Sequence, residues 1–326
     1  MTEPSRAFDE TIALLHKELS RAPGPVKEVA AYLSSSLGKG VRIKMLLICA
    51  MDKTGRIAPD AVRAAAAVEL LHMATLVHDD IIDESELRRG IPAVHNKFGK
   101  EKAVLGGDWL LCLAFRQILE VNLPEGQNKD HQSRVSQAKI FARTAERLCL
   151  GELDERNNLA NVDLSARDYL RIIDRKTAAL FCLAARGGAE VLGASPKETI
   201  LCVRFARYFG HLFQIVDDVK DYAMGEEAAG KSVQNDLLTG VITMPLILAF
   251  DRDPALKILA LDIIKSRAGL DVFLPKLFKT DAFERGRRIC HKYAQKARSV
   301  LNDKLMEHRR EAFSTMVDKV LEALPD

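Results

Sequence analysis

The stretch LVHDDIIDESELRRG, residues 76–90, ends a long apolar segment with three aspartates and then two arginines. The run before it, AVRAAAAVELLHMATLV (61–77), is apolar on nearly every face of a helix. It predicts a helix with Asp60 as N-cap that continues to about Glu86, longer than the usual globular helix. A helix that is apolar all round belongs in the middle of a bundle.

A second long helix carries the same acidic pattern at its end. The sequence SPKE predicts its start, with Ser195 as N-cap, Pro196 at the first helical position and Glu198 completing a capping box. The helix then continues through TILCVRFARYFGHLFQIVDDVKDY to near Gly225. It repeats the D-D-x-x-D spacing with Asp217, Asp218 and Asp221.

The whole chain is typical of an all-α, soluble, globular protein. Its 326 residues are 48% hydrophobic and 29% charged, which excludes disorder, and a net charge of +3 gives no reason to expect a nucleic-acid partner. The 11 prolines leave long gaps with helical apolar periodicity, and no Asn-Gly or Asp-Gly hairpin signal occurs. No linker divides the chain, so residues 1–326 are expected to form a single domain.

Location is predicted from what the sequence lacks. We find no apolar run near the roughly 18 residues of a membrane span and no secretion signal at the start. The six scattered cysteines resemble reduced core residues. These features predict a cytoplasmic protein without a transmembrane segment.

The aspartate spacing predicts a metal site. In each motif the first and last aspartates share one face of the helix, with the middle one about 100° round. The C-terminal end of a helix disfavours anions, and buried acids are costly unless they are paired or bind a metal. Oxygen ligands without Cys or His indicate Mg²⁺, which commonly bridges carboxylates and phosphates. Two such helix ends facing each other would hold Mg²⁺ around a diphosphate, with basic side chains completing the cage: Arg88, Arg89, Lys176 and Lys231. The alternative is a pair of solvated acidic helix ends.

Several motifs in order resemble those of the trans-type polyprenyl diphosphate synthases. LVHDDIIDESELRRGIPAVHNKFG is similar to the family's first aspartate-rich motif, and FQIVDDVKDY to its second. The resemblance covers most of the chain, including LGKGVRIKMLL (37–47), AVLGGDWLL (103–111), DRKTAALF (174–181) and GKSVQNDLLTGVITMPLI (230–247). It implies a bundle of mostly antiparallel helices around a deep central cavity, in a homodimer.

The resemblance also implies the chemistry. An allylic diphosphate such as farnesyl diphosphate would be held by about three Mg²⁺ ions on Asp79, Asp80, Asp83, Asp217, Asp218 and Asp221. Its oxygens would contact Arg88, Lys176 and Lys231, and it would be oriented by Thr177 and Gln214. Ionisation would leave an allylic cation, which isopentenyl diphosphate, bound by Lys39, Arg42, His72 and Arg89, would attack to extend the chain by one five-carbon unit.

Some positions carry two interpretations or depart from the family pattern. His72 could instead be a satisfied core histidine, and His78 is expected to be a packed or hydrogen-bonded neighbour rather than a ligand. The acids of GELDE, Glu152, Asp154 and Glu155, could line the site or form a solvated face. Gly40, Ile43, Glu155 and Val241 differ from the family's usual residues, which puts substrate affinity in doubt more than catalysis.

Product length is predicted from the residues that precede Asp79. Ala74 and Thr75 lie about 6 to 7.5 Å deeper along the helix axis, where short-chain relatives tend to carry an aromatic block. Small residues here, with Leu71 and the alanines 64–67 below, predict an open tunnel and a product of about C30 to C50, with octaprenyl diphosphate as the central expectation. The alternative is that the alanines only permit close helix packing.

Two other functions compete with this interpretation. A class I terpene cyclase also uses an acidic helix end with Mg²⁺, but its second motif normally continues with Ser or Thr and then Glu, where this chain has Asp221 and Gly225. A non-catalytic subunit of a heteromeric synthase would be expected to lose aspartates, and all six are present.

Overall fold

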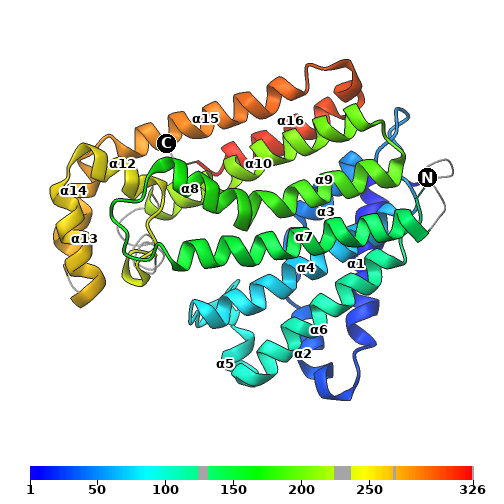
Figure 1. Cartoon of the computed structure of the whole chain (residues 1–326), viewed down its shortest axis with the longest axis horizontal. Coiled ribbons are helices and arrows are strands. Elements are labelled where there is room, and N and C mark those ends of the chain that lie inside the picture. The colour runs from blue at the N-terminus through cyan, green and yellow to red at the C-terminus, as the bar shows by residue number, and fades with distance from the viewer. Residues whose placement is uncertain (124–130, 224–235, 267–268, 325–326) are drawn as a thin grey trace. The chain divides into compact units, whose positions relative to one another are not determined.

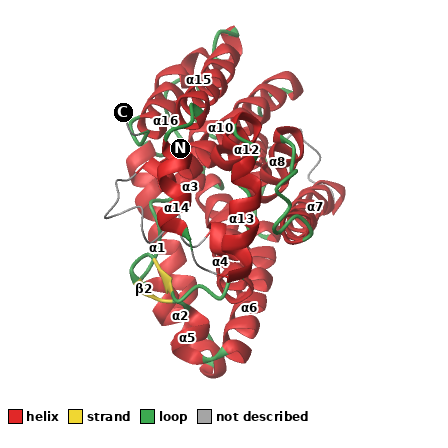
Figure 2. Ribbon diagram, turned by 90° about the vertical axis from the view of Figure 1, so that its left-hand side faces the viewer, coloured by secondary structure: helices red, strands yellow, loops and turns green. Residues whose placement is uncertain are grey.

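The computed structural model describes the chain except residues 124–130, 224–235, 267–268 and 325–326, and the side chains of 131–136. The described chain divides into two compact units. The first unit comprises Met1–Glu146, Leu180–Val203 and Asp303–Arg309, and the second comprises Arg147–Ala179, Arg204–Asn302 and Arg310–Asp326. Both are helical, as predicted (Figures 1 and 2).

The elements follow one another along the chain in this order. The helices are α1 (Pro4–Ser20), α2 (Lys27–Ser34), α3 (Val41–Cys49), α4 (Ala61–Ile82), α5 (Val94–Phe98), α6 (Lys100–Leu119), α7 (His131–Arg156), α8 (Ala166–Ile173), α9 (Ala179–Leu192), α10 (Pro196–Ala223), α12 (Met244–Arg252), α13 (Ala255–Ser266), α14 (Leu270–Phe278), α15 (Ala282–Val300) and α16 (Arg310–Leu321). Shorter elements are 3₁₀ turns at Gly24–Val26 and Lys304–Arg309, a π-helical turn at Asp174–Ala178, and the strands β1 (Leu87–Arg88) and β2 (Ile91–Pro92).

Helix α4 forms the core of the first unit. It packs against α1, α3 and α6 (Figure 1), and the alanines 64–67 are at most 1% exposed. Contrary to the expectation from the sequence, this helix is long and apolar enough to cross a membrane, but most of its apolar window is buried inside the protein. It is therefore a core helix. Asp60 precedes it as predicted, yet its carboxylate makes no cap bond and accepts the Asn122 backbone N–H at 3.1 Å.

The end of α4 comes four residues earlier than the predicted Glu86. Glu84 adopts the left-handed conformation (φ 51°), which turns the chain out of the helix. The Ser85 N–H then reaches back to the Asp80 carbonyl at 3.0 Å, and the Glu84 N–H to the Ile81 carbonyl at 3.4 Å. This pair of bonds is a Schellman motif, which satisfies helix-end carbonyls without a glycine.

Helix α10 begins at Pro196, as predicted, but its capping box is only half formed. The Ser195 hydroxyl accepts the Glu198 N–H at 3.3 Å. The Glu198 carboxylate instead accepts Nη1 of Arg309 at 2.5 Å. The predicted end near Gly225 lies outside the described residues, which follow α10 to Ala223.

Arg309 is fully buried and closes the C-terminal end of α3. Its Nε donates to the Ile48 carbonyl at 2.9 Å, and its Nη2 donates to the carbonyls of Cys49 and Met51 at 2.9 and 3.0 Å. The buried guanidinium is thus satisfied by three carbonyls and one carboxylate, as a buried charge requires.

The cysteines do not all lie in the core. All six are free thiols, but Cys112 and Cys149 are exposed, so the sequence interpretation was wrong for these two. Both lie on long helices whose outer faces are solvated, and an apolar neighbourhood in sequence does not fix which face a residue occupies.

Gly40 is one of the departures from the family pattern, and its conformation explains it. It precedes α3 with φ of +60°, a left-handed conformation that costs other residues free energy. A Cβ atom there would lie 2.8 Å from Cε2 of Phe8 on α1. Any side chain at position 40 would therefore displace Phe8. Ile43, another departure from the family pattern, is 1% exposed and packs in the core of the first unit.

We expect Gly40→Ala to lower the free energy of unfolding by about 2 kcal/mol or more, through backbone strain and the collision with Phe8. Gly55→Ala is the matched control: Gly55 has φ of +81°, but a methyl group at this position would meet nothing within 4 Å, so only the strain of about 1 kcal/mol applies. Urea unfolding measures both. Equal losses would show that Phe8 yields without cost.

Candidate active site

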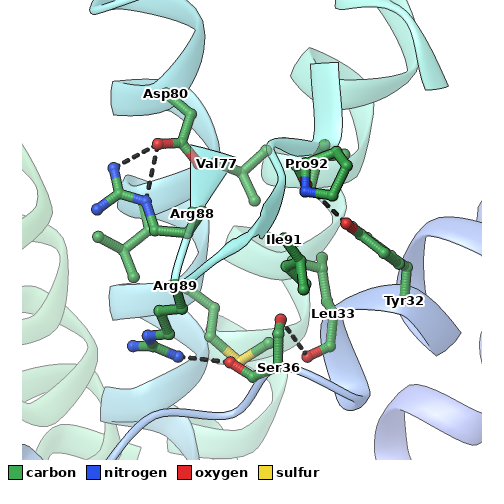
Figure 3. Close-up of a pocket in the computed structure, with 12 residues that line it drawn as sticks. Tyr32, Leu33, Ser36, Val77, Asp80, Arg88, Arg89, Ile91 and Pro92 are labelled. Atoms are coloured by element: carbon green, nitrogen blue, oxygen red, sulfur yellow. Dashed lines mark hydrogen bonds and ion pairs between the residues drawn. The ribbon is translucent and has the colours of Figure 1, made fainter. Parts of the chain in front are cut away.

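A tight hairpin directs the arginine pair to two different places (Figure 3). Strands β1 and β2 are joined by Arg89 and Gly90, both left-handed (φ 54° and 81°), as a type I′ turn requires. Arg88 turns to Asp80, donating from Nε at 2.8 Å and from Nη2. Arg89 turns the other way and donates to the Ser36 carbonyl at 2.5 Å.

Within the first acidic motif, Asp80 differs from its two neighbours. It is 2% exposed and neutralised by Arg88, whereas Asp79 and Asp83 are half-buried. His78 is a hydrogen-bonded neighbour, as predicted: Nε2 lies 3.2 Å from the Val104 carbonyl and 3.5 Å from Asp108. Its ring occupies the place where a Cβ of Gly107 would be, so α6 needs glycine at this position.

Arg42 and His72 form a pair in the first unit. Arg42 Nη1 lies 3.1 Å from His72 Nε2, and its guanidinium lies 4.8 Å from the centroid of the Phe181 ring. Burial and the Arg42 charge hold the pKa of His72 well below its usual range, so the ring is neutral. Since the guanidinium can only donate, Nε2 accepts and Nδ1 carries the proton. Burial lowers the pKa of Arg42 to about 10, which leaves it charged at neutral pH.

The remaining basic residues of this predicted site, Lys39 and Arg89, differ in setting. Lys39 is exposed. Gly38 lies directly beneath Arg89, because a Cβ there would collide with the Arg89 guanidinium. This glycine therefore lets the guanidinium lie against the loop before α3.

Glu69 is a buried acid that the sequence analysis did not select. It is 4% exposed, one turn before His72 on α4, and Oε2 has no hydrogen-bond partner among the described residues. Burial raises its pKa, while the charge of Arg42 opposes that rise. A single acid within AVRAAAAVELLHMATLV was a visible signal, because an isolated buried carboxylate needs a cationic neighbour.

The second acidic motif belongs to a hydrogen-bonded chain in the second unit. Thr177 donates to Oε1 of Gln214 at 2.7 Å, and Gln214 Nε2 donates to Oδ1 of Asp218 at 2.9 Å. The Tyr169 hydroxyl donates to Oδ2 of Asp218. The structure thus brings together three residues selected from the sequence and adds Tyr169, which lies 49 positions from Asp218 and gave no sequence signal.

Burial dominates the electrostatics of this motif. It raises the pKa of Asp218, 5% exposed, to about 8 despite the bonds from Tyr169 and Gln214. It also raises the pKa of Asp221 to about 6, with Asp217 adding to the rise, and shifts the pKa of Asp217 in the same direction. Each carboxylate would therefore gain from a neighbouring cation, because a positive charge favours the ionised form.

The donor set fits a hard divalent ion such as Mg²⁺. Its oxygens come from carboxylates, without thiol or imidazole. In the part of the chain that the structure describes, no three His, Cys, Asp or Glu side chains are gathered closely enough to hold an ion by themselves.

Lys176 lies on the π-helical turn and is held by α7. Its Nζ lies 2.7 Å from Oε2 of Glu152 and also contacts Glu155. Asp154 pairs with Arg175 at 2.5 Å, so all three acids of GELDE contact the basic pair of this turn. Lys231, the other predicted lysine, lies outside the described residues.

The residues predicted to set product length are mostly buried. Ala74 and Leu71 are each 2% exposed, and Thr75 is half-buried, with its hydroxyl bonded to the His72 carbonyl at 2.8 Å. That the two acidic helix ends face each other across a cavity stays a prediction, as does the role of these residues.

Comparison with known proteins assigns the family. Residues 24–273 match the Polyprenyl synthetase family. The chain is 33% identical over 303 residues to heptaprenyl diphosphate synthase component 2 of Bacillus subtilis, covering 90% of this chain and 83% of the relative. It is 31% identical to octaprenyl diphosphate synthase of Escherichia coli, covering 69% and 66%.

Solved structures agree. Heptaprenyl diphosphate synthase from Staphylococcus aureus superposes with a TM-score of 0.86 at 26% identity, over 98% of both chains. A decaprenyl diphosphate synthase from Rhodobacter capsulatus gives 0.84 at 28% identity, over 99% of this chain and 97% of that one. The chain therefore has the isoprenoid synthase fold and belongs to the polyprenyl synthetase family, whose members are prenyltransferases that use divalent metal ions with diphosphate substrates.

Proposed function

We propose that this prenyltransferase adds isopentenyl diphosphate units to an allylic diphosphate and releases a medium- to long-chain all-trans polyprenyl diphosphate. Asp79, Asp80 and Asp83 of α4, with Asp217, Asp218 and Asp221 of α10, would bind about three Mg²⁺ ions. Bound Mg²⁺ would offset the charge that develops on the leaving diphosphate. The observation that carries this proposal is the desolvation of the second motif, which raises the pKa of Asp218 to about 8 and that of Asp221 to about 6.

The chain's own residues would bind and orient the two substrates. Arg88, Lys176 and Lys231 would contact the allylic diphosphate, and Thr177 with Gln214 would orient it. Arg42, His72, Arg89 and Lys39 would bind isopentenyl diphosphate. The neutral His72, protonated at Nδ1, would donate to a diphosphate oxygen. The buried Glu69 would help to hold Arg42, since its negative charge favours the charged guanidinium and opposes the effect of burial on the Arg42 pKa.

Incubation of the purified chain with farnesyl diphosphate, radiolabelled isopentenyl diphosphate and Mg²⁺ tests the proposal. We expect elongated prenyl diphosphates, detected by chromatography after dephosphorylation, and loss of product when the metal is chelated. A cyclised hydrocarbon would replace the proposal with terpene cyclisation. No product from the isolated chain would favour a heteromeric enzyme, which the name of the Bacillus subtilis relative, component 2, suggests as the second candidate.

Product length is proposed to be about C30 to C50, with octaprenyl diphosphate as the central expectation, because Ala74 and Thr75 leave space one turn below Asp79. The relatives do not fix a length, since their names run from geranylgeranyl to nonaprenyl diphosphate synthase.

We expect Ala74→Phe to shorten the main product to C20 or below, because an aromatic ring would close the tunnel about 7 Å below the metal-binding end of α4. Ile200→Phe is the control: it places the same aromatic ring at a side chain that is 56% exposed, on α10 in the same unit, and should leave product length unchanged. Product analysis of both variants measures the effect. An unchanged product from Ala74→Phe would refute the tunnel assignment.

A homodimer through α6 is also proposed. The outer face of α6 carries a stripe of exposed apolar side chains near its two ends, with Leu105 67% exposed and Val104 42% near the start of the helix and Leu119 47% exposed at its end. A second copy would cover this stripe in a symmetric interface. We also propose that the protein is cytoplasmic and that residues 1–326 form one domain.

We expect Leu105→Glu to shift the protein from dimer to monomer, because the charge would replace the most exposed apolar side chain of the stripe and would have to be buried. Ile200→Glu provides the control, since Ile200 is similarly apolar and 56% exposed but lies on α10. Sedimentation velocity distinguishes the species. A dimer that survives Leu105→Glu would place the interface elsewhere.

A further inference from the structure

The π-helical turn Asp174–Ala178 of the second unit is held by contacts from two helices. The Ala179 N–H donates to the Asp174 carbonyl five residues earlier, so the chain inserts one extra residue between α8 and α9. Turns of this kind are rare and occur frequently at functional sites. This one carries Lys176, which is proposed to contact the allylic diphosphate, and Thr177, which is proposed to orient it.

Helix α7 fits against the turn along one face. Arg147, Gly151, Asp154 and Glu155 are spaced so that they share that face. A Cβ at Gly151 would lie 2.7 Å from the backbone nitrogen of Lys176 and 3.0 Å from the backbone carbonyl carbon of Arg175. The two backbones therefore meet at a point where only glycine fits.

Asp174 ties the turn to two helices. Its Oδ1 accepts Nε of Arg207 at 2.6 Å, and its Oδ2 accepts Nη2 of Arg207 and Nη2 of Arg147, both at 3.0 Å. His211 Nε2 lies 3.4 Å from Oδ1. The Asp174 side chain is only 12% exposed, so these charge-assisted bonds are partly shielded from water.

The contacts of α10 are arranged in a single row. Arg207, His211, Gln214 and Asp218 lie at i, i+4, i+7 and i+11, one stripe of the helix. Arg207 and His211 contact Asp174, and Gln214 contacts Thr177. Asp174 at the start of the turn and the Thr177 hydroxyl inside it therefore both contact the face of α10 that ends at Asp218 of the second acidic motif.

We propose that Asp174 is a positioning residue, which sets the backbone of the π-helical turn so that Lys176 and Thr177 meet the diphosphate of the allylic substrate. The inference rests on the proposed diphosphate contacts of these two residues. Asp174 itself touches no substrate. It acts through the turn, so its removal costs substrate binding even where the fold persists.

A double-mutant cycle tests the inference. Asp174→Asn keeps the shape but removes the charge, and we expect it to weaken Mg²⁺-dependent binding of inorganic diphosphate and to raise the KM for farnesyl diphosphate, each about tenfold. In a Lys176→Met background the same change should cost less than about twofold, because the group that Asp174 positions is gone. Calorimetry measures diphosphate binding, and steady-state kinetics separates KM from kcat.

Controls keep the test independent of stability. Asp251→Asn removes a carboxylate that pairs with Arg285 on the surface of the same unit, 68% exposed, and should leave both quantities unchanged. If circular dichroism shows that Asp174→Asn does not fold, Arg207→Gln takes its place. This variant removes the bidentate partner of Asp174 and should weaken diphosphate binding by the same factor expected for Asp174→Asn.

The outcomes distinguish a wrong role for Lys176 from a wrong role for Asp174. If Lys176→Met leaves diphosphate binding unchanged, the proposed role of Lys176 is wrong, and with it the reason for Asp174. If Lys176→Met weakens diphosphate binding, and Asp174→Asn weakens it by about a further tenfold in the Lys176→Met background, only the positioning inference is overturned. An Asp174→Asn variant that behaves like Asp251→Asn overturns it as well.

Discussion

The rest of the structure depends on carboxylates that are buried at the C-terminal ends of α4 and α10. Each such group has lost hydration and faces the negative end of its own helix, so the ionised form needs compensation. In the first unit Arg88 supplies it for Asp80. In the second unit the described bonds to Asp218 come from neutral donors, Tyr169 and Gln214, and its pKa stays raised to about 8. Asp218 therefore retains an electrostatic demand that these neighbours do not satisfy.

Several described basic residues of the candidate site already have partners. Arg89 is held by the Ser36 carbonyl, Arg42 lies against His72, and Lys176 is held by acids of α7. These contacts fix long, flexible side chains before a substrate arrives, which reduces the entropy that binding must overcome. For Lys176 they also impose a competition, because a diphosphate must replace carboxylates that already bind the ammonium group.

Periodicity and spacing predicted the two helices and their acidic ends, and the family resemblance supplied most of the other residues of the candidate site. They did not predict where α4 ends, since a glutamate with positive φ carries no sequence signature, or the β1–β2 hairpin, whose turn is Arg-Gly rather than Asn-Gly. Tyr169 and Asp174 escaped notice for another reason. Their partners lie dozens of positions away in sequence, and only the packing of α7, α8 and α10 brings them together. Local patterns report which face a residue occupies, not which side chain it will meet.

Arg309 links early and late parts of the chain in time as well as in space. The carbonyls at the end of α3 receive their guanidinium from a residue 261 positions later in the sequence. During synthesis on the ribosome, the N-terminal helices emerge and pack long before that residue exists, so the first unit is completed only late in translation. Contacts of such high sequence separation form slowly, because a long loop must close first. A nascent or C-terminally shortened chain would therefore expose an open seam beside α3, where chaperones and proteases could act.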